Sequence, residues 1–457
     1  MQKSLVFIFS FLILTRFNID PDLGWHLAYG REFLEVGRII RVDEFSWTMS
    51  GYAWGNSYFL YQILVTFIFN NFGHIASGLI FGVLAAIGVT LIFKRVDLWK
   101  FLLLWISAML ASANLGIRPH TFSFLFFAVL LVLLERRFFE KWWQPFFWFS
   151  FFCLWANLHR GFLVGLLVFG AFVILDALFL RAQKKRIKFS KRVPSLVAAI
   201  LGTLVTPFPF ELWHSGVIID VTSKANLLTI AEWQSIAFFF PINLLWAFCG
   251  LVFIYVFLKK SKEIEPVWLL IGAGCFMFSF IVSTFAFYWV LIFLFIVSRH
   301  LEFKFFLKWD FWAKLPLWFS IGAVFVVVFL SQLAHALESY ELANRLKIDK
   351  YPVGALDFLR QNNLGASIFN EYGWGGFIDW RYPEIQVFID GRMASWRKEE
   401  GRGILDDYLA IRGGKCDALG NYGIQTVLVN RDTDTKCFSE FNKVYEDEVA
   451  KVLQLGW

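Results

Sequence analysis

Charged residues are scarce in this chain. Asp, Glu, Lys and Arg make up 17% of the 457 residues, whereas apolar residues make up 58% and aromatic residues 20%. A soluble globular domain carries about a quarter charged residues. The apolar residues also recur in stretches of roughly membrane-spanning length. The sequence therefore excludes an ordinary soluble domain and predicts a polytopic α-helical membrane protein.

Cysteine is also sparse, with five residues in the whole chain. Cys153, Cys249 and Cys275 lie in apolar runs and are expected to be inert packing residues. Cys416 and Cys437 lie in the polar C-terminal part without CxxC spacing, which argues against a zinc site. An extracytoplasmic location of that part would allow a disulfide between these two residues.

Several short motifs of catalysis and cofactor binding are missing. The chain has no Gly-rich phosphate loop, no HExxH and no GxSxG nucleophile elbow, and no Ser-His-Asp or Cys-His arrangement has a supporting local context. No cofactor or metal site is therefore predicted, although a divalent metal is left open. The chain also shows no internal repeat, which argues against a transporter.

The charges that are present are distributed unevenly. Residues 334–457 carry 15 Lys and Arg against 19 Asp and Glu, a net charge of −4. The preceding part carries a net charge of +11, so the whole chain has a net charge of +7. The bases of the preceding part cluster in short loops between apolar runs, as the positive-inside rule produces. We therefore expect no nucleic-acid partner, and we place the N-terminus and these basic loops in the cytoplasm.

The apolar runs predict about 11 spans within residues 1–333, if residues 57–72 form a helix in the membrane interface instead of a span. The first run, Ser4 to Leu14, is followed by no small-residue cleavage site and is expected to stay in the protein as a helix. The first outer loop, residues 18–72, and a C-terminal domain, residues 334–457, would then be extracytoplasmic. The remaining spans are expected at 75–93, 101–116, 119–134, 142–157, 161–180, 194–209, 241–258, 266–283, 285–299 and 313–333.

The C-terminal domain has the pattern of a small α/β domain. Strands are expected at 367–369, 386–389 and 425–429, and helices at 352–362, 403–411 and 417–421. Because strands and helices alternate, we expect a largely parallel sheet. Asn370-Glu371 and Asp390-Gly391-Arg392 follow two of the strands, where α/β folds bind ligands, although turn chemistry explains such residues equally well.

The first outer loop is rich in groups that could carry chemistry. Near its start it reads Asp20-Pro21-Asp22-Leu23-Gly24-Trp25-His26, and Arg31 follows in the same loop. Asp22 could act as a general base with His26 one helical turn away, whereas a helix cap and a solvated histidine are the plainer interpretations. Trp54 suits a membrane interface and could also stack on a sugar ring.

Other polar residues fall at the predicted outer ends of later spans, among them Arg118, His120, His159, Arg160 and Glu232. Arginine on the outer side runs against the positive-inside bias and can bind a phosphate. An arginine side chain that only reaches the lipid headgroups is an equally good explanation. If the topology holds, these groups converge with Asp22 on one side of the bilayer. Such a set suits an anionic substrate anchored in the membrane by a lipid.

The segment from Asp20 to Ser46 resembles the first outer loop of a group of bacterial multispanning proteins that look like GT-C glycosyltransferases, which use polyprenyl-phosphate sugars. The resemblance continues at Arg118-Pro119, at Trp155 to His159 and at Glu232 to Ser235. It returns in the C-terminal domain at Asn370 to Gly376 and at Val387 to Arg392. It implies a GT-C-like membrane domain, a lipid-linked sugar donor and a glycan, lipid or protein acceptor in the bacterial cell envelope.

The resemblance also implies roles for individual residues. By its position in the motif, Asp22 matches the general base of an inverting sugar transfer at the outer face of the cytoplasmic membrane, and Asp20 is the second choice. By location alone, Arg118, His159 and Arg160 are candidates for binding the lipid phosphate. Substrate contacts are expected from His26, Arg31, Trp54, Glu232, Asp390 and Arg392.

Two segments depart from the pattern of these proteins. A His-Glu pair usually follows the tryptophan of the first loop, where this chain has Asn56-Ser57-Tyr58. Many members carry an arginine pair near the tenth span, where this chain has Thr284 to Trp289. The alternative function is therefore a non-catalytic GT-C-like scaffold whose outer domain binds a glycan or a protein partner, and a transporter ranks third.

Overall fold

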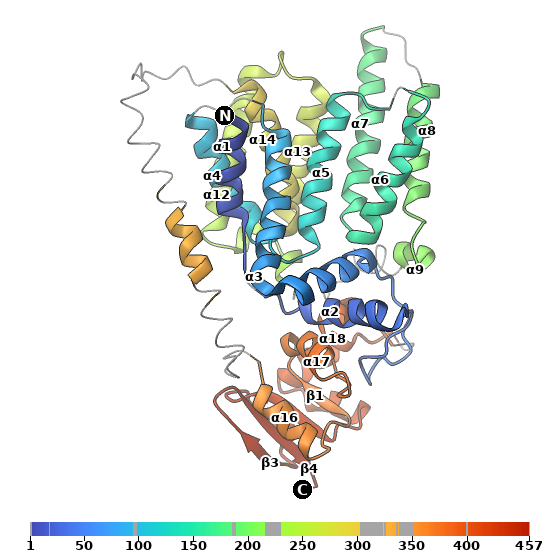
Figure 1. Ribbon diagram of the computed structural model, residues 1–457, viewed down its shortest axis with the longest axis vertical. Coiled ribbons are helices and arrows are strands. Elements are labelled where there is room, and N and C mark those ends of the chain that lie inside the picture. Colours follow the sequence, from blue (N-terminus) through green and yellow to red (C-terminus); the bar gives the residue numbers. More distant parts are fainter. Residues whose placement is uncertain are drawn as a thin grey trace. The chain divides into compact units, whose positions relative to one another are not determined.

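The computed structural model describes residues 2–17, 19–94, 98–139, 141–184, 189–214, 230–301, 323, 326–334, 337, 351–398 and 401–456. The chain is mostly helical and has a small sheet near its C-terminus (Figure 1). Two compact units can be distinguished. Unit 1 comprises Met1–Asn18, Phe72–Thr206 and Thr229–His335, and unit 2 comprises Ile19–Asn71, Pro207–Leu228 and Ala336–Trp457.

Unit 1 is built from apolar helices. They are α1 (Gln2–Leu14), the second half of α3 (Phe59–Ile92), α4 (Leu98–Ser112), α5 (His120–Glu135), α6 (Gln144–Leu158), α7 (Phe162–Ala182), α8 (Phe189–Gly202), α12 (Ile242–Lys260), α13 (Pro266–Ile281) and α14 (Ala286–His300), with the short 3-10 turns η3 (Ala231–Trp233), η4 (Ile236–Phe238) and η5 (Ser283–Phe285). Every residue of α14 from Ala286 to Ser298 is buried, because this helix is apolar on all sides. It packs against α4, α5, α12 and α13 and is the centre of the unit.

Four described helical segments are long and apolar enough to cross a membrane: α3, α7, α12 and Ser283–His300. The expected count of about 11 spans is not supported. The other apolar helices of the described part have 10–17 residues, which at 1.5 Å per residue cover about 15–25 Å of a roughly 30 Å hydrocarbon core. The sequence prediction counted apolar turns, such as the one before Pro119, as parts of helices. Only residues 323 and 326–333 of the span expected at 313–333 are described.

Helix α3 is broken at Gly73, where φ is 76° and ψ is 179°. Residues with a side chain are strained at such a positive φ, so glycine suits this position. The break falls between the helix expected at 57–72 and the span expected at 75–93. This predicted boundary is therefore confirmed.

Unit 2 contains a four-stranded sheet of order β1-β2-β4-β3. Its strands are β1 (Ile368–Asn370), β2 (Thr426–Asn430), β3 (Phe441–Glu446) and β4 (Ala450–Leu455). β1 and β2 are parallel, whereas β4 is antiparallel to both β2 and β3. The expectation of a largely parallel sheet is wrong because the prediction does not include the antiparallel β3–β4 hairpin. β3 carries the exposed charged residues Lys443 and Glu446, which hide its strand pattern.

Helices and turns surround this sheet: α16 (Val353–Gln361), η6 (Tyr372–Trp374), α17 (Gly375–Arg381), η7 (Gly391–Ser395), α18 (Ile404–Arg412), η8 (Cys416–Asn421) and η9 (Lys436–Phe438). α16 and α18 confirm two predicted helices, and the third, at 417–421, is a 3-10 turn. Leu356, Ile378, Leu428 and Val452 are fully buried and join helices and strands in one core.

The strand expected at 386–389 pairs with the first loop instead of the sheet. Val387 donates a backbone hydrogen bond of 2.9 Å to Phe45 and accepts one of 3.1 Å from Trp47. The side-chain amide of Asn370, at the end of β1, also binds this segment: it donates to the Ile389 carbonyl oxygen and accepts from the Phe388 backbone N–H. The prediction of a sheet strand is therefore wrong here, because these backbone groups are already bound.

The first loop belongs to the same compact unit as the C-terminal domain. It contains α2 (Leu23–Arg31) and the π-helical turn η1 (Glu32–Val36), and a short helix α9 (Pro209–Trp213) joins it in unit 2. α2 packs against α17 at such a short distance that a Cβ added to Gly24 would overlap the carbonyl oxygen of Gly376. This grouping differs from the division by sequence, which assigned residues 18–72 to the membrane domain.

Candidate functional site

The predicted site residues fall into two clusters, one in each unit. The unit 1 cluster contains Arg118, His159, Arg160 and Glu232, and the unit 2 residues are Asp20, Asp22, His26, Arg31, Trp54, Asp390 and Arg392.

In unit 1 the four predicted residues stand at the ends of separate elements. Arg118 precedes α5, His159 and Arg160 connect α6 to α7, and Glu232 lies in η3. Nη1 of Arg118 lies 2.5 Å from Oε1 of Glu232. The guanidinium of Arg160 lies over the ring of Trp233, 5.6 Å from its centroid. The structure thus brings polar groups from three chain segments together.

His120 packs beside His159 in this cluster. The ring centroids of His120 and His159 are 4.4 Å apart, and Nε2 of His120 lies 4.0 Å from Oε2 of Glu232. Nδ1 of His159 accepts hydrogen bonds from the Gly161 backbone at 3.1 Å and from the Ser123 hydroxyl at 2.6 Å. The neutral His159 ring therefore carries its proton on Nε2, which is a donor. The sequence places His120 beside Arg118 at the same predicted helix end but assigns it no role in the site.

Glu232 is held as a carboxylate by its neighbours. Burial raises its pKa, but the charges of His120, Arg118 and Arg160 outweigh burial, so the pKa lies below its usual value. The hydroxyl of Thr284 donates a 2.7 Å hydrogen bond to the Glu232 carbonyl oxygen. Thr284 thus helps to hold η3 in place. Because two arginines face one carboxylate, the cluster has an excess of positive charge and suits an anion.

In unit 2, Asp22 stands at the first position before α2 but makes no capping hydrogen bond with its side chain. Its backbone N–H donates to Oδ1 of Asp20 at 2.8 Å. The Asp22 carboxylate lies against Gly391, where an added Cβ would overlap Oδ1. Burial, and then the charges of Asp20 and Asp22, raise the pKa of the nearby Tyr351 to about 12. The half-buried Asp22 carboxylate is thus not used as a helix cap.

His26, Arg31 and Trp54 make contacts inside unit 2. His26 is 3% exposed and its ring lies 3.5 Å from that of Trp25, so the interpretation as a solvated histidine is wrong. Arg31 donates a 2.9 Å hydrogen bond to the carbonyl oxygen of Trp380, near the C-terminal end of α17. Nε1 of Trp54 donates to the Tyr29 hydroxyl at 3.1 Å.

Asp390 and Arg392 bind each other in the interior of unit 2. Nη2 of Arg392 lies 2.5 Å from Oδ2 of Asp390, and Nη1 lies 2.8 Å from Oδ1 of Asp43. Burial lowers the pKa of Arg392, but Asp390, Tyr29 and Asp43 outweigh it, and the pKa stays above its usual value. The guanidinium is surrounded by the rings of Tyr29, Phe45, Trp54 and Trp396. Asp390 and Arg392 are therefore bound within the fold and are not open to a substrate.

Asp379 of α17 is a third acid beside Arg392. Its Oδ2 lies 4.0 Å from Nη2 of Arg392, and neither of its carboxylate oxygens has a hydrogen-bond partner among the described residues. Burial and the charges of Asp390 and Asp43 raise the pKa of Asp379 well above its usual value, although Arg392 opposes them. Burial and the neighbouring acids thus favour the neutral form of Asp379.

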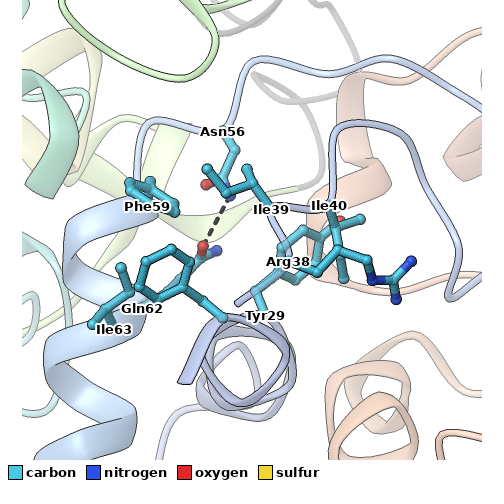
Figure 2. A pocket seen from close by; sticks show the side chains of 9 residues that line it. Tyr29, Arg38, Ile39, Ile40, Asn56, Phe59, Gln62 and Ile63 are labelled. Atoms are coloured by element: carbon cyan, nitrogen blue, oxygen red, sulfur yellow. Dashed lines mark hydrogen bonds between the residues drawn. The ribbon is translucent and has the colours of Figure 1, made fainter. Parts of the chain in front are cut away.

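A pocket in unit 2 lies over α2 and the start of α3 (Figure 2). Its lining residues are Tyr29, Phe33, Arg38, Ile39, Ile40, Asn56, Phe59, Gln62 and Ile63. Nδ2 of Asn56 donates to Oε1 of Gln62 at 2.8 Å, and Oδ1 of Asn56 accepts from the Tyr58 backbone at 3.0 Å. Asn56 lies in the segment where the resembled proteins have their His-Glu pair. An amide bound on both sides fills this position and supplies no acid.

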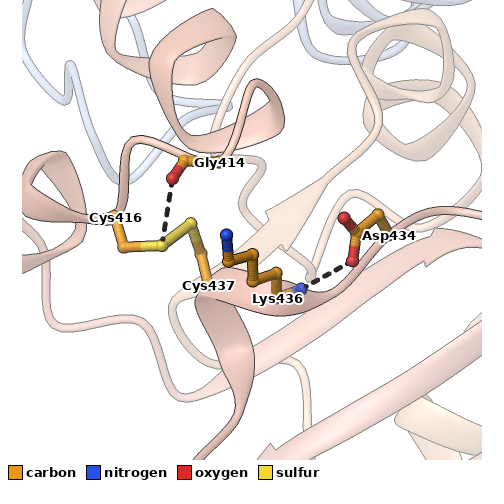
Figure 3. Close-up of a disulfide and its surroundings, with 5 residues drawn as sticks. All are labelled: Gly414, Cys416, Asp434, Lys436 and Cys437. Atoms are coloured by element: carbon orange, nitrogen blue, oxygen red, sulfur yellow. Dashed lines mark hydrogen bonds between the residues drawn. A yellow bond between two sulfur atoms is a disulfide. The ribbon is translucent and has the colours of Figure 1, made fainter.

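Cys416 and Cys437 form a disulfide that joins η8 to η9 (Figure 3). Cys249 and Cys275 are buried and free, as expected of packing residues, and Cys153 is free and half-buried. Among the residues that the structure describes, no three His, Cys, Asp or Glu side chains are arranged to hold a metal ion.

Neither a known protein family nor a curated protein matches the chain.

Proposed function

We propose that the protein is a membrane glycosyltransferase that moves a sugar from a polyprenyl-phosphate donor to an acceptor hydroxyl. The observation that carries this proposal is the unit 1 cluster at the ends of apolar helices, in which Arg118 pairs with the ionised Glu232, the charge of Arg160 acts on the same carboxylate, and His159 packs against His120. Helix ends of this kind are where the phosphate of a lipid anchored in the bilayer would lie. A phosphate requires several N–H donors and an excess of positive charge, and the cluster offers both.

The cluster would act on the leaving group. Arg118 and Arg160 would bind the phosphate oxygens, and Nε2–H of His159 would donate a further hydrogen bond. The negative charge on the phosphate grows as its bond to the sugar breaks, so cations in fixed positions stabilise the transition state more than the bound donor. The ion pair with Glu232 and the contact with Trp233 would keep the two guanidinium groups in place before the donor binds.

Asp22 would be the general base. It would take the proton from the acceptor hydroxyl while the hydroxyl oxygen attacks the anomeric carbon. The bond from that carbon to the phosphate oxygen breaks at the same time, its electron pair leaves with the lipid phosphate, and the anomeric configuration inverts. A half-buried carboxylate that makes no helix cap supports this role. Asp20 is the second choice because its Oδ1 already accepts the Asp22 backbone N–H.

The same proposal places the protein in the cytoplasmic membrane of a bacterium, with the N-terminus inside and the C-terminal domain outside. The apolar helices of unit 1 are compatible with a membrane location. The Cys416–Cys437 disulfide supports an extracytoplasmic C-terminal domain, because disulfides persist in oxidising compartments. The acceptor would be a glycan, a lipid or a protein of the cell envelope.

The test is consumption of a polyprenyl-phosphate sugar by the purified protein in lipid vesicles. Asp22→Asn keeps the shape of the side chain and removes its basicity, so turnover should fall about 10²–10⁴-fold. Asp417→Asn, at an exposed position, is the matched control and should keep full turnover. Full activity of Asp22→Asn would reject Asp22 as the base, and full activity of the double variant Asp20→Asn/Asp22→Asn would reject the mechanism.

A non-catalytic scaffold that binds a glycan or a protein is the second candidate. The Asn56–Gln62 pair favours it, because an amide stands in the segment where the resembled enzymes carry an acid. In that case the wild-type protein would retain a lipid-linked sugar without consuming it. Turnover by the wild-type protein that is lost in Asp22→Asn would rule the scaffold out.

A further inference from the structure

The Asp390-Gly391-Arg392 turn of the C-terminal domain contacts the acid that we assign as the general base. We infer that Gly391 is a positioning residue for Asp22, so that the C-terminal domain sets the place of the carboxylate. This inference rests on the proposed function and deepens it. It gives the C-terminal domain a part in the transfer reaction in place of a separate glycan-binding role.

The space beside the Gly391 Cα atom is filled by the Asp22 side chain. A Cβ added to Gly391 would overlap Oδ1 of Asp22 and would lie 2.9 Å from its Cγ and 3.4 Å from its Oδ2. Gly391 is not among the glycines with a positive φ, so other residues could adopt its backbone conformation. A side chain at position 391 would therefore displace the Asp22 carboxylate, and glycine serves here for space and not for its conformational freedom.

The turn that carries Gly391 is itself fixed. The Arg392 backbone N–H donates to Oδ1 of Asp390 at 2.8 Å, and the buried Arg392 side chain binds Asp390 and, in the first loop, Asp43. The turn is thus tied to the same loop that carries Asp22. Gly391 has little freedom to move away from the carboxylate.

The chain on either side of Asp22 is in equally close contact with α17. A Cβ added to Gly376 would lie 2.6 Å from the carbonyl oxygen of Pro21, and a Cβ added to Gly24 would overlap the Gly376 backbone. The backbone before and after Asp22 is thus held by α17 while Gly391 holds the carboxylate. A displacement of about 1 Å can lower the rate of a catalysed reaction about 10²-fold, so the fit at Gly391 bears directly on proton transfer.

A double-mutant cycle in thermal unfolding tests the contact without measuring activity. Gly391→Ala should lower Tm in the wild-type background, because the Asp22 carboxylate must turn away from the added methyl group. It should lower Tm by much less in the Asp22→Ala background, where that space is open. Gly420→Ala is the matched control, because a Cβ at Gly420 meets nothing within 4 Å, and its effect should be the same in both backgrounds.

Kinetics then separate a positioning role from a purely structural one. In folded Gly391→Ala, kcat should fall about 10²-fold while the KM for the donor stays near the wild-type value. Equal Tm losses in the two backgrounds would overturn the inference, and so would wild-type kcat in Gly391→Ala. Coupled Tm losses together with full activity of Asp22→Asn would overturn the proposed function and, with it, the positioning role.

Discussion

Nη1 of Arg392 lies 2.8 Å from Oδ1 of Asp43, and both side chains are fully buried. Asp43 belongs to the first loop and Arg392 to the C-terminal domain, so this contact joins two segments that lie far apart in the sequence. The desolvation of the two charges is offset by hydrogen bonds: Asp43 also accepts from the Ser46 backbone at 3.0 Å, and Arg392 also donates to the Tyr29 hydroxyl at 2.7 Å. A buried pair of this kind strongly destabilises the fold when one partner is removed.

The first prediction concerns this ion pair. Arg392→Leu should lower the free energy of unfolding of the protein by about 3–5 kcal/mol, because it leaves the Asp43 and Asp390 carboxylates buried without a cation. Arg38→Leu is the matched control, because Arg38 is 47% exposed and its pairs with Glu32 and Glu44 lie at the surface. Its effect should stay within about 1 kcal/mol. Denaturant unfolding in detergent measures both values, and equal losses would contradict the importance of the buried pair.

Asp379 leads to a prediction on pH. Its pKa is raised in the folded protein, so the folded state holds a proton that the unfolded state releases once the pH exceeds the usual aspartate value. Stability should therefore fall as the pH rises from about 4 toward the raised pKa, by up to about 1.4 kcal/mol per pH unit. Asp379→Asn cannot ionise and should remove this decline. Its Tm should equal that of the wild type near pH 4 and exceed it at pH 7, and parallel Tm–pH curves would contradict the assignment.

The disulfide leads to a third prediction. The Cys416–Cys437 bond closes a loop with a sequence separation of 21 residues. In the chain-entropy description, losing such a constraint on the unfolded chain lowers the free energy of unfolding by about 3 kcal/mol. Cys416→Ser/Cys437→Ser should therefore lower Tm. Dithiothreitol should lower the Tm of the wild type to a similar value and leave that of the double variant unchanged. A wild-type Tm that does not respond to complete reduction would contradict this prediction.

Helices and strands with a strong local pattern could be predicted from the sequence, and tertiary contacts could not. β1 and β2 are short apolar runs, and α16 follows Pro352, so their positions are confirmed. β3 is half-exposed and charged, which makes it resemble a loop, and its partner β4 is not predicted although Ala450, Val452 and Leu453 are buried. The segment 386–389 has the composition of a buried strand and is indeed buried, but its backbone partners lie in the first loop.

The same limit applies to the candidate sites. Arg118 and Arg160 could be singled out because arginine at a predicted outer helix end runs against the topological bias. Asp390 and Arg392 could be picked as polar residues after a predicted strand, but only the fold shows that they bind each other and Asp43. Asp379 could not be recognised as a buried acid, because nothing in the sequence distinguishes a buried carboxylate from a solvated one.

The last prediction tests phosphate recognition apart from catalysis. The unit 1 cluster should bind a polyprenyl phosphate that carries no sugar, because the proposed function assigns its cations to the phosphate group and not to the sugar. Arg118→Ala removes a guanidinium whose charge-assisted hydrogen bonds are each worth roughly 1.5–3 kcal/mol, so Kd should rise about 10–100-fold. Arg118→Lys keeps the charge and loses the planar fork, and its Kd should lie between those of the wild type and Arg118→Ala.

The control for that titration is Arg360→Ala, which removes an exposed arginine paired with Glu384 in unit 2 and should leave Kd unchanged. A variant that does not titrate, His159→Gln, can still offer an N–H donor and should bind more tightly than His159→Leu, because Nδ1 of the wild-type ring accepts from Gly161 and leaves the proton on Nε2. If Arg118→Ala and Arg360→Ala bind polyprenyl phosphate equally well, the unit 1 cluster does not recognise phosphate. Arg118 and Glu232 would then be a structural ion pair that joins η3 to the start of α5, and the stability of unit 1, in place of donor affinity, would fall when either is replaced.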